Sequence, residues 1–365
     1  MKILIIDNAP LVKSGDKYLT NSMNGHFFSE LKELGNDVSC FQLKKKVNSA
    51  ISNYDLTADG IHCYTSPLTS SKLLTYIIAF IKLFLLIPRY DFIYIYYPNS
   101  FKYAGLYCKM IGVKFGFYIR GEKNLFDQVS IYNYKKASLI LTVSQFFTDN
   151  IRKYNKTTST IRPMIPYQFE DIIDTRSYKP KHNYKILFLS RVSKSKGIDD
   201  LLYAMKMLKS DKINVTLEVV GNGEYIEDAK KLTAELNIDD IVTFYGPVYD
   251  DQIKSNFYLE ADFYILPSFH EGFPRTVYEA MIFGTPIITT FVGGMASLMK
   301  HKYNCLEIKK GSPESITETV KYALINYDEI GILAKNATKT IKTVIAKERD
   351  SHAVQLYKQI QLYVR

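Results

Sequence analysis

The sequence contains no tryptophan and only four cysteines among its 365 residues. No C-x-x-C pair and no histidine cluster with metal-ligand spacing is present, so a zinc site or a disulfide framework is not expected and a reducing compartment fits. The start of the chain has no signal peptide pattern, because only the apolar tetrad ILII precedes Asp7. We therefore expect a cytoplasmic protein. The cysteines, which lie far apart, are Cys40, Cys63, Cys108 and Cys305.

A long apolar run is also missing. Residues 73–87 are apolar apart from Thr75 and Lys82, but this segment is shorter than the roughly 20 apolar residues that span a bilayer. Three interpretations stay open: a buried core helix, a helix lying on a bilayer surface, and a transmembrane helix. In the second, Lys72, Lys82 and Arg89 would face anionic headgroups.

Charge is distributed unevenly along the chain. Residues 1–170 contain 21 Lys and Arg against 12 Asp and Glu, a net charge of +9. Residues 171–365 contain 26 and 25, a net charge of +1. This asymmetry suggests that the first half faces an anionic partner, either a membrane or a nucleic acid, although a solvated basic surface would look the same.

Short apolar runs alternate with amphipathic segments along most of the chain, and the length suggests two domains. Residues 2–7, 91–97 and 113–122 predict strands in the first half, with a loop after the first of them. Residues 184–209 predict a strand, a loop and a helix in the second half. Such alternation is typical of an α/β protein with doubly wound parallel sheets.

The most informative stretch is 267–286, which reads PSFHEGFPRTVYEAMIFGTP. Pro274 is placed where a helix would begin, and Gly284 then supplies a left-handed end. The first turn of a helix is an anion site, since it carries free N–H groups and the positive end of the helix dipole. Glu271 precedes this turn and Glu279 lies about one turn inside the helix. Taken alone, both glutamates could be solvated charges near a helix end.

HEGFPRTVYEAM resembles the glutamate-x7-glutamate motif of retaining glycosyltransferases of the "glycosyl transferases group 1" family, and ADFYILPS and GTPIITTFVGG resemble the same block. The similarity covers roughly residues 184–325. It implies two Rossmann-like doubly wound domains facing across a cleft, the GT-B type. The implied division is an acceptor-binding domain at 1–168, a donor-binding domain at 169–345 and a terminal helix at 346–365 that crosses back to the first domain.

The resemblance also assigns roles to residues. Arg191 and Lys196 match an Arg-x4-Lys-Gly element whose cations hold the donor diphosphate, and with Glu271, which binds the sugar, they form the implied catalytic set. Glu279 is expected to bind the ribose. No metal site is implied. Further donor contacts implied by the resemblance are Gly272, Phe273, Arg275, Thr276, Val277, Gly221, Pro247 and Val248.

The chain departs from the family pattern at three places. Gly15 stands alone where family members often carry a Gly-Gly pair, and Ser297 replaces a glutamate that follows a later Gly-Gly pair. Arg120 and Glu122 occupy the place of a histidine near the reacting sugar. Gly15, Arg120 and Glu122 are thus candidate sugar or acceptor contacts, and a structural ion pair is an equal alternative for the last two.

These features predict a retaining, metal-independent glycosyltransferase that needs no cofactor. Its donor would be a nucleotide-diphosphate sugar. Its acceptor would be a saccharide carried on a polyprenyl lipid, in surface polysaccharide (capsule, O-antigen or exopolysaccharide) biosynthesis at the cytoplasmic face of the membrane. A sugar-nucleotide epimerase or a sugar phosphorylase would share this fold. A basic nucleic-acid-binding protein is a further alternative, but no motif supports it, and no G-x-G-x-x-G favours a dehydrogenase.

Overall fold

A computed structural model describes residues 1–45, 52–346 and 349–364. The chain divides into two compact units, one formed by residues 1–164 with 349–365 and the other by residues 165–348. The point of division falls within residues 162–172, which have the sequence of a linker. Each unit has its own sheet and its own buried hydrophobic side chains.

The first unit is built on a mainly parallel sheet. Its parallel strands run in the order β5-β3-β1-β6-β7-β8-β9, while β2 and β4 extend it with antiparallel pairs. Along the chain the order reverses at β1, because β3 and β5 lie on one side of it and β6 to β9 on the other. The strands are β1 (Lys2–Ser14), β2 (Lys17–Thr20), β3 (Asp37–Lys45), β4 (Tyr54–Asp55), β5 (His62–Pro67), β6 (Phe92–Tyr97), β7 (Lys114–Ile119), β8 (Leu139–Thr142) and β9 (Thr158–Thr160).

The prediction of a loop directly after residues 2–7 is wrong. A register shift between Ile6 and Pro10 lets β1 continue beside β3 as far as Ser14. The chain then turns at Gly15, whose φ is +59°, and returns as β2 in antiparallel pairing with β1. Polar residues and a proline suggest a break at this position in the sequence, but the irregularity in the ladder absorbs them and the strand resumes.

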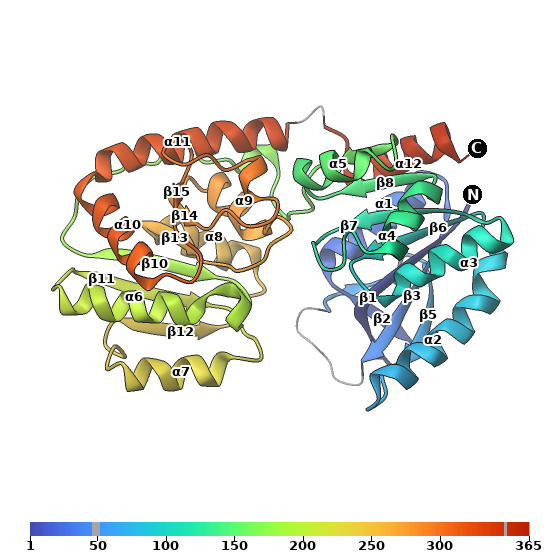
Figure 1. Ribbon diagram of the computed structural model, residues 1–365, viewed down its shortest axis with the longest axis horizontal. Coiled ribbons are helices and arrows are strands. Elements are labelled where there is room, and N and C mark those ends of the chain that lie inside the picture. Colours follow the sequence, from blue (N-terminus) through green and yellow to red (C-terminus); the bar gives the residue numbers. More distant parts are fainter. Residues whose placement is uncertain (46–51, 347–348, 365) are drawn as a thin grey trace. The chain divides into compact units, whose positions relative to one another are not determined.

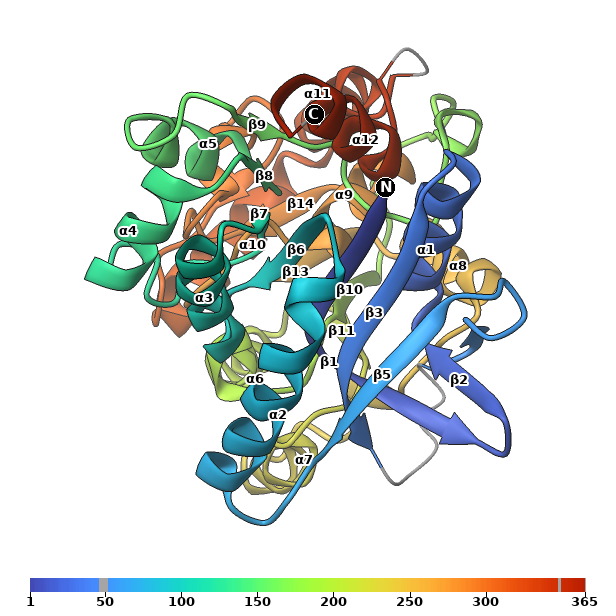
Figure 2. The same cartoon turned by 90° about the vertical axis from the view of Figure 1, so that its right-hand side faces the viewer.

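Two sets of helices cover the two faces of this sheet. Side chains of α2, α3, α4 and α5 share one core with one face of the sheet, and those of α1 and α12 share another core with the opposite face. Figure 2 shows α1 and α12 apart from α2 and α3. The helices are α1 (Ser22–Glu33), α2 (Lys72–Leu86), α3 (Ala104–Ile111), α4 (Gln128–Lys136), α5 (Gln145–Arg152) and α12 (His352–Tyr363), with short turns η1 (Ile87–Arg89) and η2 (Ser100–Tyr103).

Helix α2 accounts for most of the apolar segment 73–87. Thr75, Ala79 and Leu83 bury one side of the helix in the core of the first unit, so part of the segment is a core helix. The opposite side carries large exposed apolar residues. No helix within residues 1–45, 52–346 and 349–364 is long and apolar enough to cross a bilayer. The exposed residues are Leu73, Leu74, Ile77, Ile81, Phe84 and Leu85.

The second unit is built on a fully parallel sheet in the order β12-β11-β10-β13-β14-β15. Numbered along the unit, this is the Rossmann order 3-2-1-4-5-6, which reverses between its first and fourth strands. The reversal therefore lies between β10 and β13. The strands are β10 (Tyr184–Leu189), β11 (Val215–Val220), β12 (Val242–Gly246), β13 (Phe263–Leu266), β14 (Ile287–Thr289) and β15 (Leu306–Glu307).

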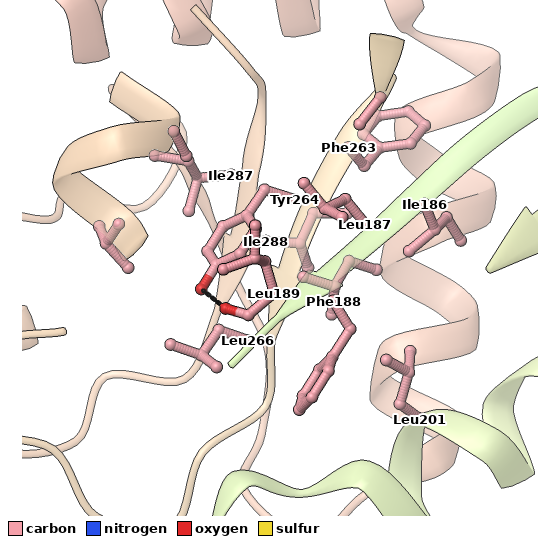
Figure 3. Close-up of a cluster of buried hydrophobic side chains, with 14 of the residues drawn as sticks. Ile186, Leu187, Phe188, Leu189, Leu201, Phe263, Tyr264, Leu266, Ile287 and Ile288 are labelled. Carbon is pink, nitrogen blue, oxygen red and sulfur yellow. Dashed lines mark hydrogen bonds between the residues drawn. The ribbon is translucent and has the colours of Figure 1, made fainter. Parts of the chain in front are cut away.

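Helices lie on both faces of the second sheet (Figure 1). Helix α6 packs against α7 and α10, and α9 packs against α8 and α11. Side chains from both faces of β10 and β13 are buried (Figure 3), as parallel strands between two helical layers require. The helices are α6 (Ile198–Ser210), α7 (Ile226–Glu235), α8 (Asp251–Glu260), α9 (Arg275–Ile282), α10 (Pro313–Ile325) and α11 (Tyr327–Val344), with short turns η3 (Phe169–Asp171), η4 (Lys194–Lys196) and η5 (Met295–Ser297).

Candidate functional site

The strand reversal in the second unit places two loops side by side. In open α/β sheets, ligands bind outside the carboxyl ends of the strands at the point where the strand order reverses. The loop after β10 carries Arg191 and Lys196, and the loop after its neighbour β13 carries Glu271. Helix α9, which carries Glu279, follows directly. The sheet topology thus brings together residues that are about 80 positions apart in the sequence.

Lys196 and Glu271 form an ion pair between these two loops. The ammonium group of Lys196 contacts Oε1 of Glu271, and the hydroxyl of Ser268 donates to the same oxygen at 2.7 Å. The side chains are 20% and 8% exposed, so the pair is largely shielded from water. Sequence reasoning missed Ser268, although a polar residue directly after a buried strand and three positions before Glu271 is a usable signal.

The two loops also pack backbone against backbone. Gly197 has a φ of +74°, and a Cβ atom there would lie 2.1 Å from the carbonyl oxygen of Pro267. No other residue type fits this position without displacing one of the loops. The glycine therefore fixes the distance across which Lys196 reaches Glu271.

The glycines after β11 support the loop that carries Arg191. A Cβ atom on Gly221 would lie 2.0 Å from the oxygen of Ser190, and one on Gly223 would lie 2.0 Å from the oxygen of Val192. These contacts place the glycine turn directly against the backbone of the Arg191 loop. The side chain of Arg191 itself is exposed.

Helix α9 begins beside this ion pair with no side-chain cap. Pro274 is the N-cap and Arg275 the first helical residue, so the helix starts one position later than the sequence suggests. The hydroxyl of Tyr264 lies 2.6 Å from Oγ1 of Thr276, and Val277 is buried. Gly284 ends the helix with a φ of +61°, which confirms the expected left-handed position. The positive end of the helix dipole is thus directed to the loop of Glu271.

Glu279 is buried one turn into α9. Its carboxylate is 5% exposed and accepts a hydrogen bond of 2.8 Å from the hydroxyl of Tyr258 in α8. Burial raises the pKa of Glu279, while Lys254 and the hydrogen bond from Tyr258 pull it back toward the usual range. Tyr258 and Tyr264 were not predicted as site residues, because their spacing in a helix and a strand is also that of ordinary core positions.

Gly272 and Phe273 shape the same loop. The carbonyl of Gly272 accepts a hydrogen bond of 2.9 Å from the N–H of Gly294. Phe273 is buried and stacks on Tyr278 with ring centroids 4.3 Å apart. Ser297, which stands in place of the family's glutamate, donates to the carbonyl of Gly294. The loop of Glu271 is therefore tied to the Gly-Gly turn that follows β14.

Pro247 and Val248 follow β12, at the same edge of the second sheet but farther from the strand reversal. Gly246, with a φ of +74°, turns the chain into this loop. Pro247 is exposed and Val248 packs partly against the core.

Arg120, a candidate residue of the first unit, lies in an ion pair at the sheet of that unit. Arg120 donates to Oδ1 of Asp7 at 2.9 Å and lies over the ring of Tyr96, 4.6 Å from its centroid. Asp7 is fully buried and accepts a second hydrogen bond, of 3.0 Å, from Asn24. Arg120 is thus held in an ion pair with Asp7. Asp7 and Asn24 were missed, although an aspartate directly after a buried first strand is a recognisable signal.

The other two candidates of this unit lie in different settings. Gly15 lies at the tip of the β1–β2 hairpin, with open space where a Cβ atom would be. Glu122 is partly exposed in the segment after β7. Among the residues that the structure describes, no three His, Cys, Asp or Glu side chains are grouped as a metal ion would require.

The second-unit site coincides with a match to a known family. Residues 170–340 match the family model described as "Glycosyl transferases group 1". This range contains the ion pair, helix α9 and the glycine turn described above. For residues 170–340, this match confirms the resemblance to the glycosyl transferases group 1 family that the sequence shows.

Curated relatives carry the same description over part of their length. An uncharacterized glycosyltransferase of Methanocaldococcus jannaschii is 31% identical over 156 residues, which are 43% of this chain and 40% of that protein. The putative glycosyltransferase YtcC of Bacillus subtilis is 26% identical over 271 residues, or 68% of this chain and 64% of that protein. The chain thus spans between about two fifths and two thirds of these relatives.

Solved structures match the whole chain in fold. Anabaena HepE in complex with UDP and glucose matches with a TM-score of 0.69 and 18% identity, covering 99% of this chain and 98% of that one. Sucrose-phosphate synthase from Thermosynechococcus elongatus matches with a TM-score of 0.71 and 19% identity, covering 99% of each chain. These matches confirm the prediction of two Rossmann-like units of the GT-B type.

Proposed function

We propose that this chain is a retaining glycosyltransferase that moves a sugar from a nucleotide-diphosphate sugar to a saccharide acceptor. The observation that carries the proposal is the Lys196–Glu271 pair beside the uncapped start of α9. A cation, a carboxylate and a helix N-terminus at one strand reversal suit a ligand that combines a diphosphate with hydroxyl groups. The match of residues 170–340 to the glycosyl transferases group 1 model supports this interpretation.

In this proposal the second unit binds the donor. As the bond between sugar and phosphate breaks, negative charge grows on the leaving diphosphate. Lys196, Arg191 and the first N–H groups of α9 would stabilise that charge most in the transition state. Because Glu271 holds Lys196 before the donor arrives, the ammonium group is already in position. Little free energy is then needed to reorient it during the reaction.

The two glutamates would take opposite ends of the donor. Glu271, in the loop, would accept hydrogen bonds from the sugar hydroxyls, and Glu279, inside the helix, would accept them from the ribose. The hydroxyl of Tyr258 orients one oxygen of Glu279 and leaves the other for a ligand. No nucleophilic side chain takes part, and the charge on the diphosphate is balanced by the protein without a metal ion.

The first unit would bind the acceptor at the cytoplasmic face of a membrane. Its part of the sequence carries nearly all of the net positive charge, and α2 exposes a row of large apolar side chains. Cations with apolar side chains beside them favour an anionic lipid surface. We infer that the acceptor is a lipid-linked saccharide of a surface polysaccharide pathway.

A thermal-shift screen of nucleotide sugars tests the donor, beginning with UDP-glucose because HepE holds UDP and glucose in its structure. We expect a nucleotide sugar to stabilise the wild-type protein and Glu279→Ala to lose both this shift and the transfer of sugar. Glu227→Ala is the matched control, since its side chain is an exposed helix glutamate of the same unit. Wild-type transfer by Glu279→Ala would refute the assignment.

Product analysis tests the reaction itself. A glycoside with the anomeric configuration of the donor, formed at the same rate with EDTA, is the expected result. An inverted anomer contradicts retention, and a loss of rate with EDTA contradicts metal independence. An epimerised nucleotide sugar or a sugar phosphate as product would show an epimerase or a phosphorylase instead.

A further inference from the structure

The first unit contains a polar pocket of about 330 Å³ at the carboxyl end of β6 and beside Asn8, where the pairing of β1 with β3 shifts register. This is the strand reversal of the first sheet, where α/β proteins bind ligands. Among the described residues, three lysines and no acidic side chain line the pocket. The lining residues that matter here are Lys72, Lys102, Lys123, Asn8, Asn99 and Ser100.

The lysines make the pocket suited to an anion. Lys102 is almost fully buried, contacts Asp127 and lies 3.2 Å from the hydroxyl of Ser130. Lys72 and Lys123 form no ion pair within the described part of the chain. The starts of α2, at Lys72, and of the helical run 100–111 both lie at this pocket, so two helix dipoles add positive potential.

A second cavity continues from the first. An apolar groove of about 610 Å³ runs along the exposed side of α2 and shares Lys72, Tyr76, Ser100 and Tyr103 with the polar pocket. Its walls include Leu73 and Ile81, which are 73% and 57% exposed. Figures 1 and 2 both show α2 and α3 next to each other at one side of the first sheet. Burial of so much apolar surface favours a hydrocarbon ligand.

We propose that this pocket and groove bind one amphiphile, a lipid phosphate or diphosphate that carries the acceptor saccharide. Its hydrocarbon chain lies along α2 between Leu73 and Phe84, and its phosphate lies among Lys72, Lys102 and Lys123. The role as acceptor rests on the proposed function, but the binding site does not. The acceptor is thus recognised by its lipid phosphate as well as by its sugar.

The buried position of Lys102 distinguishes this occupant from a bilayer surface. The Lys102 side chain is only 6% exposed, so a headgroup contacts it only by entering the pocket. A flat bilayer would cover the apolar side of α2 and leave the pocket empty. A single lipid, in contrast, fills groove and pocket together, because they meet at Lys72 and Tyr76.

Isothermal titration with farnesyl diphosphate, a soluble isoprenoid diphosphate, tests the proposal, with inorganic pyrophosphate and farnesol as partial ligands. We expect farnesyl diphosphate to bind at least about tenfold more tightly than either. The double variant Lys72→Gln/Lys123→Gln and the double variant Ile77→Ser/Ile81→Ser should each lose about tenfold or more. Lys109→Gln and Met110→Ser, exposed residues of α3 outside both cavities, should bind as the wild type does.

Three results would overturn the proposal. Pyrophosphate binding as tightly as farnesyl diphosphate would leave a simple anion site. Equal binding by all variants would place the ligand elsewhere. Flotation with phosphatidylglycerol vesicles that needs Ile77 and Ile81, without any binding of farnesyl diphosphate, would show a bilayer-docking surface.

Nucleotide-sugar binding, measured on the same proteins, separates this inference from the proposed function. A donor that binds where farnesyl diphosphate does not would leave the transferase proposal standing and refute the lipid site. Binding of farnesyl diphosphate without any binding of a nucleotide sugar would support the lipid site and refute the transferase proposal.

Discussion

The two units have sheets of the same design and differ at the edge where the strand order reverses. The first sheet runs β5-β3-β1-β6 and the second β12-β11-β10-β13, so each reverses after its first strand. At that edge the second unit pairs Lys196 with Glu271 beside a helix start. The first unit pairs Arg120 with Asp7 and adds a lysine pocket that opens into an apolar groove.

This difference teaches that the fold fixes where a ligand binds and the loops fix which ligand it is. The second edge holds one cation and one carboxylate in a largely dry contact, which suits a ligand that is anionic in one part and hydroxylated in another. At the first edge, the described lining of the lysine pocket contains no acidic residue and the pocket opens into an apolar groove, which suits an amphiphilic anion. The following variants test whether the two edges are indeed specialised in this way.

The largest effect is expected from Lys196→Ala. In the proposed reaction Lys196 stabilises the developing charge, so its loss should lower kcat by about 10² to 10³, or about 3 to 4 kcal/mol in the barrier. Lys194→Ala is the control, since Lys194 is exposed on the same loop and lies over the ring of Tyr225. Steady-state kinetics with the identified donor measure both, and equal rates for the two variants would contradict a special role of Lys196.

Arg120→Ala should destabilise the first unit and leave the second unchanged. It removes the guanidinium from a buried carboxylate whose remaining hydrogen bonds in the described part of the chain come from Asn24 and the N–H of Ala9. An uncompensated buried charge costs about 2 to 3 kcal/mol when its partner is partly exposed. Urea unfolding measures the loss. Lys17→Ala, which breaks an exposed pair with Asp55, should cost less than about 0.5 kcal/mol.

His352→Gln tests whether the buried, uncharged ring of His352 in α12 makes the stability of the first unit depend on pH. Burial, and then the charge of Arg120, lowers the pKa of His352 from 6.5 to about 3, and the ring lies 2.9 Å from the hydroxyl of Tyr94. Between those values the unfolded chain binds a proton that the folded chain does not, so stability falls as pH falls. From pH 7 to pH 5 the wild type should lose about 2 kcal/mol more than the variant.

Urea midpoints of both proteins at both pH values check this, because the other titrating groups affect the two proteins equally. A variant whose stability falls as steeply as that of the wild type would show that His352 is protonated in the folded protein.

The smallest effect is expected from the protonation of Glu279 in the wild-type protein. Burial raises its pKa, so the carboxylate that would accept hydrogen bonds from a ribose is lost at a higher pH than for an ordinary glutamate. Nucleotide affinity should fall by about twofold at the pH where half of the Glu279 side chains are protonated. Glu279→Gln should bind weakly at every pH, without this decline. Titration calorimetry from pH 7 to pH 4.5 measures it, and a pH profile shared by wild type and variant would count against the ribose contact.

Much of the second unit was predictable because its signals are local. The helix start at Pro274 and its end at Gly284 follow from backbone preferences, and the prediction was off by one residue at the start. The first unit was less predictable. The β1–β2 hairpin was missed because the continuation of β1 depends on pairing with β3, and no short-range pattern reveals such pairing.

Local sequence by itself determined the alternation of strands and helices, the loop that carries Glu271 and the family model that residues 170–340 match. Only the tertiary structure decided that Lys196 contacts Glu271, that Tyr258 holds Glu279, that Arg120 pairs with Asp7, and that one side of α2 stays exposed. The physical reason is one of range. Caps, turns and periodicity act within a few residues, whereas an ion pair or an exposed helix face depends on which distant strands lie next to each other in the sheet.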